Sequence, residues 1–160
     1  MHTNRIIAKS LYAFSHTSPT INNIQKFFNK KTIGNGNNAV IMGNNTFQNA
    51  PCMPDREALV LTRKNLNHNI PYFNTHFNNT FDLCQYAKSR HFDELWIIGG
   101  KELFNRAFTM ALSKNIYIAE MDITEIDSET RKTNIAKIPN NYDLHWETKW
   151  EKENNIPYRF

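Results

Sequence analysis

Short apolar runs alternate along the chain with longer stretches in which apolar and polar residues are mixed. The apolar runs cover residues 6–14, 39–42, 58–61, 95–98 and 116–121, and the mixed stretches cover 21–31, 81–92 and 104–112. Short apolar runs are typical of buried strands, whereas apolar residues at three- and four-residue spacing are typical of helices. Because the two kinds of segment alternate, we predict an α/β fold with a mainly parallel sheet and helices on both faces.

Two of the predicted helices have further local support. In the segment KELFNRAFTMALSK the apolar residues recur at helical spacing and predict one buried face, made of Leu103, Phe104, Ala107, Phe108, Ala111 and Leu112. Thr80 directly precedes FDLCQYAK, and threonine is a frequent helix N-cap. We therefore predict that this helix is capped by Thr80.

The pattern changes after Met121. A long polar connection leads to YDLHWETKW and IPYRF, which we predict to form an antiparallel pair at a sheet edge. On a strand Trp146 and Trp150 would share one face, and a core position is the more common reason for that spacing. The asparagine-rich segments IGNGNNAV and NHNIPYFNTHFNN predict loops. No repeat or linker divides the chain, so we predict one domain over residues 1–160.

The 160 residues carry a formal net charge of +4, and the basic residues are scattered along the chain. Scattered positive charge favours a small anionic ligand over nucleic acid. No apolar run is long enough to span a bilayer, and the opening segment is too polar for a signal peptide, so we predict a cytoplasmic protein that does not engage membranes. An organellar matrix is the alternative, because the opening segment has Arg5 and Lys9 but no acid.

No metal site and no disulfide are predicted. Cys52 and Cys84 form no CxxC pair, and the six histidines form no HxxxH or HExxH pattern. The two cysteines are best explained as packing thiols of a cytosolic protein.

Three predicted strands end in residues that suit an anion. The run AVIMG is followed by Asn44, Asn45 and Thr46, the run LWII is followed by two glycines, and the run ALVL is followed by TRK. In an open α/β sheet, ligands bind beyond the carboxyl ends of the strands, where glycines allow close approach and helix N-termini attract phosphate. Each segment alone is weak evidence, since a glycine pair after a strand is most often a tight turn. Together they predict a ligand with several phosphates.

The segments VIMGNNTF, LVLTRK, LWIIGGKELFNRAF and IYIAEMD, in this order, resemble the dihydrofolate reductase family. The resemblance runs with gaps from about residue 6 to the C-terminal IPYRF. It implies a mostly parallel sheet of eight strands with helices on both faces and the last strands antiparallel. It also implies NADPH as cofactor, a small-molecule substrate, and a place in tetrahydrofolate biosynthesis and one-carbon metabolism.

The resemblance implies a cofactor site made of Gly43, Asn44, Asn45, Thr46, Thr62, Arg63, Gly99, Gly100 and Lys101. Asn44 stands where the family usually has a basic residue, so some attraction for phosphate is lost. Arg63 corresponds to the basic residue that contacts the 2′-phosphate, which favours NADPH over NADH.

The substrate half of the family pattern is less complete. Arg56 matches the arginine that grips the glutamate carboxylate of folate, although a loop cation without directed contacts is the alternative. Phe28 matches the phenylalanine that packs on the pterin, and Phe104 lies where the family has an aromatic residue near the nicotinamide. The family's pterin-binding carboxylate falls at Ile24, and its pocket threonine falls at Ala119.

The missing carboxylate has no evident substitute. The first acidic residue of the chain is Asp55, so no shift of register supplies an acid. The family's Pro-Trp loop motif is absent, and the connection over residues 14–20 is shorter than usual. Glu120 is next to Ala119 but would point to the opposite face of a strand unless a bulge intervenes. The catalytic acid is therefore unknown.

Three functions remain open. The first is NADPH-dependent reduction of dihydrofolate with weak activity, supported by Arg56, Phe28 and the cofactor motifs. The second is reduction of another heterocycle, such as the pyrimidine of riboflavin synthesis, which the loss of the acid favours. The third is a non-catalytic binding or structural protein, which exposed aromatic surface would favour. We retain the first, for a monomer that binds neither nucleic acid nor membrane, and leave a partner chain open.

Overall fold

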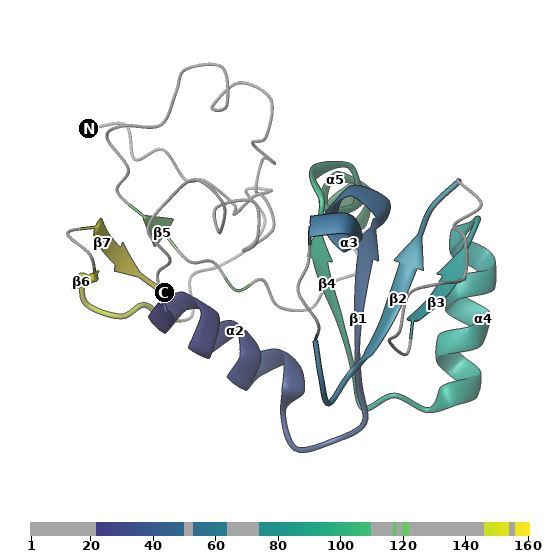
Figure 1. Ribbon diagram of the computed structural model, residues 1–160, viewed down its shortest axis with the longest axis horizontal. Coiled ribbons are helices and arrows are strands. Elements are labelled where there is room, and N and C mark those ends of the chain that lie inside the picture. Colours follow the sequence, from purple (N-terminus) through teal and green to yellow (C-terminus); the bar gives the residue numbers. More distant parts are fainter. Residues whose placement is uncertain are drawn as a thin grey trace.

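The computed structural model describes residues 22–49, 53–63, 74–109, 117, 120–121, 146–153 and 156–160. Within these residues Figure 1 shows a four-stranded sheet on one side of the molecule and a small three-stranded sheet on the other. The larger sheet has the order β3-β2-β1-β4 and is parallel throughout. Its strands are β1 (Asn38–Gly43), β2 (Glu57–Leu61), β3 (Asn74–Phe77) and β4 (Glu94–Gly99).

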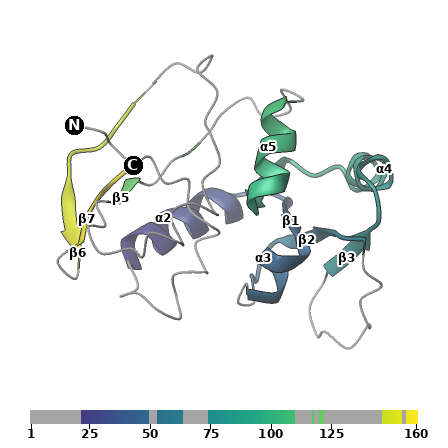
Figure 2. The same ribbon diagram turned by 90° about the horizontal axis from the view of Figure 1, so that it is seen from above.

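Helices cover both faces of the parallel sheet, which confirms the predicted α/β fold. Figure 2 shows α4 (Thr80–Arg90) and α5 (Lys101–Thr109) on one side of the strands and α3 (Asn44–Asn49) on the other. The long helix α2 (Asn22–Ile33) precedes β1 and extends toward the small sheet (Figure 1). These bounds lie within a few residues of the predicted ones.

The central strand β1 explains why its sequence is an unbroken apolar run. Ala39 and Ile41 pack into a cluster with Leu83 and Ala87 of α4, whereas Val40 and Met42 pack on the opposite face. The second cluster includes Val60 and is covered in part by Phe47 of α3. Successive residues of a strand point to opposite faces, so a strand covered on both sides must be apolar at every position.

Two local predictions are wrong. The N-cap of α4 is Asn79, whose side-chain oxygen accepts a hydrogen bond from the Asp82 backbone N–H, and Thr80 is the first helical residue. The segment that we expected to be only a loop contains β3, whose Phe77 is buried. Pairing with β2 on one side stabilises this strand despite its asparagine-rich surroundings.

The C-terminal segment forms an antiparallel hairpin, as predicted, but its first strand begins later than expected. The small sheet has the order β5-β7-β6, with β5 (Glu120–Met121), β6 (Glu151–Glu153) and β7 (Ile156–Arg159). Both pairings are antiparallel. The eight-stranded count is not confirmed, because the described residues form two separate sheets of four and three strands. The predicted first strand, 6–14, and most of the run 116–121 lie outside the described residues.

The prediction that Trp146 and Trp150 form part of the core is wrong. Neither lies in a strand, and their exposed fractions are 47% and 48%. Trp146 packs against Phe27 of α2, with ring centroids 6.1 Å apart, whereas Trp150 lies under the guanidinium of Arg159. Among the described helices, none is long and apolar enough to cross a membrane.

Candidate functional site

The carboxyl ends of three parallel strands meet at one edge of the larger sheet. Gly43 at the end of β1 pairs with Leu61 of β2, and Met42 pairs with Gly99 at the end of β4. Figure 1 shows α3 and α5 beside this edge. The residues that follow the three strands are therefore neighbours in space, as the sequence predicts for a ligand site.

Three glycines at this edge lie where a side chain would meet neighbouring atoms of the protein. A Cβ atom on Gly43 would lie 3.8 Å from Gly100 N, and one on Gly100 would lie 3.4 Å from Thr46 Oγ1. Gly99 has φ 125°, a conformation that other residues rarely adopt, and a Cβ there would lie 3.3 Å from the Phe104 ring. The Gly99–Gly100 peptide bond is cis. The three glycines thus allow the ends of β1 and β4 and the start of α5 to pack closely together.

Polar groups surround these glycines. Thr46 is buried, and its hydroxyl lies against Gly99 and Gly100. Asn44 begins α3, and both polar atoms of its side chain are buried without a hydrogen-bond partner among the residues that the structure describes. Phe104 N donates to Gly100 O at 3.0 Å, which fixes the start of α5 beside the glycine pair. We define Gly43, Asn44, Thr46, Gly99 and Gly100 as the glycine cradle.

The end of β2 adds to the same edge. The buried Thr62 donates its backbone N–H to Phe77 O at 2.9 Å, so β3 holds it in place next to the residue opposite Gly43. Arg63 follows and is exposed. Asn45 and Lys101 are exposed at the starts of α3 and α5. The nine predicted cofactor residues therefore lie at or next to one edge of the sheet.

The cradle fits a phosphate-containing cofactor. The amide atoms of Asn44, which have no hydrogen-bond partner among the described residues, can donate and accept hydrogen bonds, and the helix start at Lys101 carries partial positive charge. Arg63 provides a planar cation at the rim, which suits a further phosphate. Within the described residues, no group of three or more metal-ligating side chains is found.

The predicted substrate residues Phe28 and Arg56 are brought together at the other end of β2. Arg56 immediately precedes this strand, and its guanidinium carbon lies 5.5 Å from the Phe28 ring centroid. Its Nη2 donates to Asn29 Oδ1 at 2.9 Å, and its Nη1 donates to Thr32 Oγ1. These directed contacts do not fit a loop cation without partners.

Sequence reasoning missed Asn29 and Thr32 as part of this group. Thr32 is buried, and its hydroxyl donates to Phe28 O at 2.9 Å while it accepts from Arg56. Thr32 lies one helical turn after Phe28, and that spacing was a signal that both side chains share a face of α2.

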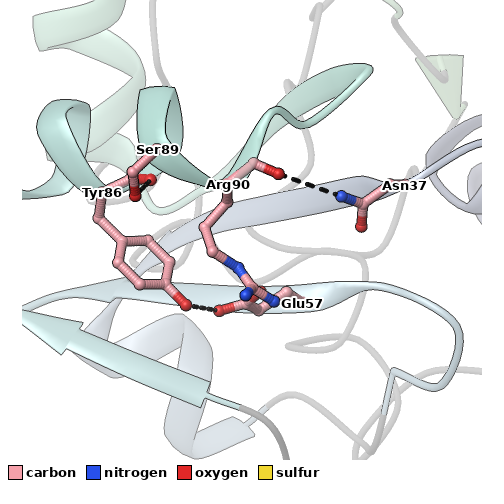
Figure 3. A network of polar contacts seen from close by, with 5 residues as sticks. All are labelled: Asn37, Glu57, Tyr86, Ser89 and Arg90. Atoms are coloured by element: carbon pink, nitrogen blue, oxygen red, sulfur yellow. Dashed lines mark hydrogen bonds and ion pairs between the residues drawn. The ribbon is translucent and has the colours of Figure 1, made fainter.

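A polar network holds the start of β2 from its other side (Figure 3). Tyr86 of α4 donates its hydroxyl hydrogen bond to the Glu57 carboxylate, and Arg90 Nη2 lies 3.4 Å from Glu57 Oε2. Asn37 Nδ2 donates to Arg90 O at 3.4 Å, which links α4 to the residue before β1. Arg56 is therefore positioned between α2 and a strand that α4 anchors.

The remaining substrate predictions fall on three elements. Ile24 lies in the first turns of α2 and is 2% exposed. Phe104 packs against Gly99, so it belongs beside the glycine cradle. Glu120 pairs with Arg159 between β5 and β7, and Ala119 lies outside the described residues.

A family model described as dihydrofolate reductase matches residues 17–160. The chain belongs to the dihydrofolate reductase family. At the level of the family this indicates reduction of dihydrofolate, and dihydrofolate reductases generally use NADPH. A search of curated proteins finds no match to this chain. Two groups of residues from the family pattern thus lie together in this chain. They are the glycine cradle and the Arg56 group, which lie at opposite ends of β2.

Proposed function

We propose that this chain is an NADPH-dependent reductase of dihydrofolate that works without the family's usual carboxylate. The observation that carries the proposal is the glycine cradle, where three glycines, the Thr46 hydroxyl and the Asn44 amide, which has no partner among the described residues, surround the meeting strand ends. A reductase of another heterocycle would use the same cradle for its cofactor. The residues on the substrate side therefore decide between the two substrates.

In this proposal, the cradle residues and Lys101 bind the pyrophosphate side of the cofactor. Thr62 and Arg63 bind the adenosine 2′-phosphate, because a hydroxyl and a planar cation follow the same strand. Asn44 supplies hydrogen bonds but no charge at a position where the family has a cation. When bound, NADPH supplies the hydride that adds to C6 of the pterin.

On the substrate side, Arg56 binds the glutamate carboxylate of dihydrofolate, and Phe28 packs on the pterin. Asn29 and Thr32 support this role because they hold the guanidinium in a fixed orientation. A fixed arginine fork loses less side-chain entropy when it takes a carboxylate. This contact favours folate over a substrate without a carboxylate tail.

The buried Ile24 offers no proton for N5 of the pterin. A positioned acid typically contributes about 10²- to 10⁴-fold in rate. Orientation of the nicotinamide against the pterin still lowers the barrier without it. We therefore propose slow turnover, with the N5 proton coming from solvent.

The test is a stoichiometric assay of the purified protein with NADPH and dihydrofolate. We expect one tetrahydrofolate formed for each NADPH oxidised, and Arg56→Ala should raise the KM for dihydrofolate without weakening NADPH. Binding of NADPH with no tetrahydrofolate formed would overturn the proposal.

A non-catalytic binding protein is the second candidate, because exposed aromatic surface favours it. Trp146 and Trp150 are each about half exposed. In that case the protein would bind NADPH or a partner through the same fold but reduce nothing, which the stoichiometric assay distinguishes.

We further propose that residues 1–160 form one domain whose complete sheet has eight strands, and that the protein is a cytoplasmic monomer. The family match over residues 17–160 and the scattered charge support this proposal.

A further inference from the structure

The C-terminal hairpin contacts the first turn of α2, the helix that carries Phe28. Glu153 of β6 accepts two backbone hydrogen bonds: Asn22 N donates to its Oε1 and Asn23 N to its Oε2, both at 3.0 Å. Figures 1 and 2 both show the hairpin beside the N-terminal end of α2. The first backbone N–H groups of a helix have no acceptor within the helix. The Glu153 carboxylate thus accepts hydrogen bonds from two of them.

This carboxylate is 130 residues away from Asn23 in the sequence. The first turn of α2 itself has no acidic residue. The other long helices of the described chain use local acids, since α4 has Asp82 and α5 has Glu102 in the first turn. A negative charge at a helix N-terminus is stabilising. Among the described residues, Glu153 of the hairpin supplies that charge to α2.

Two further hydrogen bonds join the hairpin to α2 through Tyr158. Tyr158 of β7 is 1% exposed, and its hydroxyl donates to Glu151 Oε2 at 2.7 Å while it accepts from Asn23 Nδ2 at 2.8 Å. Tyr158 and Glu151 face each other in the β6–β7 ladder. The hydrogen bond to Glu151, and then burial, raise the pKa of Tyr158, so the hydroxyl keeps its proton at alkaline pH values where an ordinary tyrosine ionises.

An aromatic contact joins the same two elements. The rings of Phe27 and Phe160 are stacked with centroids 4.1 Å apart. Phe27 and Phe28 are adjacent on α2, and they point to different neighbours, since Phe28 lies under Arg56. The hairpin therefore holds one side of α2 while the other side forms the Arg56 group.

We propose that Glu153 is a positioning residue for substrate binding: by fixing the first turn of α2 from the C-terminal hairpin, it sets where Ile24 and Phe28 stand. The inference rests on the proposed function, because it assigns α2 to the substrate. Phe28 lies about 9 Å along the helix from Asn22 at 1.5 Å per residue. Fraying at Asn22 and Asn23 would reach Ile24, the third residue of the helix, and would remove support on the N-terminal side of Phe28.

The experiment compares Glu153→Ala, the shorter carboxylate Glu153→Asp and Asp82→Ala, in the full chain. Asp82→Ala is the matched control, because it removes a first-turn carboxylate from α4, which carries no predicted site residue. For each protein we measure KM and kcat for dihydrofolate at saturating NADPH, the Kd for NADPH, and hydrogen exchange at the Asn22 and Asn23 amides.

We expect Glu153→Ala to raise the KM for dihydrofolate about three- to fivefold, with kcat and the Kd for NADPH within about twofold of the parent. Exchange at Asn22 and Asn23 should accelerate about tenfold. Glu153→Asp should restore part of both effects, and Asp82→Ala should show neither.

Equal rises in the KM for dihydrofolate and the Kd for NADPH, or the same KM rise in Asp82→Ala, would show general destabilisation and overturn the inference. If the parent reduces no dihydrofolate, the proposed function fails on that result alone. In that case, unchanged exchange at Asn22 and Asn23 in Glu153→Ala would also overturn the positioning role of Glu153. Accelerated exchange in that variant would support this role for whatever ligand α2 binds.

Discussion

Under the proposed function, Ile24 of α2 takes the position of the family's pterin-binding carboxylate, so an acid there would change the chemistry of the site. Its side chain is 2% exposed, so it fills its space with apolar atoms rather than leaving a vacancy for water. An acid introduced there would be poorly solvated, and its pKa would rise. A carboxyl group with a raised pKa is the kind of group that can donate a proton near neutral pH.

We predict that Ile24→Asp increases turnover of dihydrofolate at pH 7 by about tenfold or more, because it supplies a positioned proton donor. Replacing a buried isoleucine should also lower the free energy of unfolding by about 2–5 kcal/mol. The rates are measured under conditions where circular dichroism shows that each variant is folded.

Ile24→Asn is the control for that experiment. Asparagine is polar and has nearly the same shape as aspartate, but it has no titratable proton. A similar gain in both variants would mean that polarity rather than proton donation limits the rate. No gain in Ile24→Asp, in folded protein, would contradict the assignment of this position.

Arg63 gives a second prediction. We expect Arg63→Ala to weaken NADPH binding about tenfold or more and to leave NADH binding nearly unchanged, because only NADPH has the 2′-phosphate. Binding of both cofactors is measured by fluorescence or calorimetry. The control is Arg90→Ala, which removes another exposed arginine, at the end of α4 and beside Glu57 at the start of β2. Equal losses of NADPH and NADH binding in Arg63→Ala would contradict the role of Arg63.

At the scale of elements, α4 shows how a boundary can be misplaced by one residue. Thr80 and Asn79 are both good N-caps, and the sequence does not say which one adopts extended backbone angles. Asn79 does so, with φ −146° and ψ 161°, and its side chain accepts from Asp82 N at 2.9 Å.

We predict that Asn79→Ala lowers the free energy of unfolding by about 1 kcal/mol, whereas Thr80→Ala changes it by less than about 0.5 kcal/mol. The measurement is the midpoint of urea unfolding at unchanged m-value. A larger loss in Thr80→Ala than in Asn79→Ala would return the cap to Thr80.

The C-terminal hairpin gives a pH-dependent prediction. Because the hydrogen bond to Glu151 raises the pKa of Tyr158, the folded state holds this proton more tightly than the unfolded state. Its contribution to stability is complete below the ordinary tyrosine pKa of about 10 and is lost as the pH rises through the higher folded pKa. Stability measured by urea unfolding should therefore fall above about pH 10.

Tyr158→Phe is the matched variant, since it removes the titrating hydroxyl and keeps the ring. We expect its stability to be lower at neutral pH, because Asn23 and Glu151 lose a partner, and to depend less on alkaline pH than that of the parent. The same alkaline slope in both proteins would mean that other groups cause it.

At the scale of the whole molecule, the sequence predicted the parts that depend on local pattern. The parallel strands around β1 are apolar at successive positions, and glycines and polar residues follow them, so the meeting of these strand ends at one edge of the sheet could be predicted from the sequence. The strand β3 could not, because it depends on pairing with β2 more than on its own composition.

Contacts between distant segments were also beyond local pattern. Glu153 and Asn22 are 131 residues apart, and no spacing rule relates them. The support of Arg56 by Asn29 and Thr32 is an intermediate case, since helical spacing placed Thr32 on the face of Phe28 but did not say that Arg56 would reach it.

Under the proposed function, this dihydrofolate reductase-like chain reduces dihydrofolate with a proton taken from solvent. The most direct test is the initial rate of NADPH oxidation with dihydrofolate, measured from mildly acidic to neutral pH. We expect a slow rate that rises about tenfold for each pH unit of acidification, without a plateau. A plateau at low pH would reveal a titrating donor in the protein, and no turnover in protein that binds NADPH would contradict the reductase function itself.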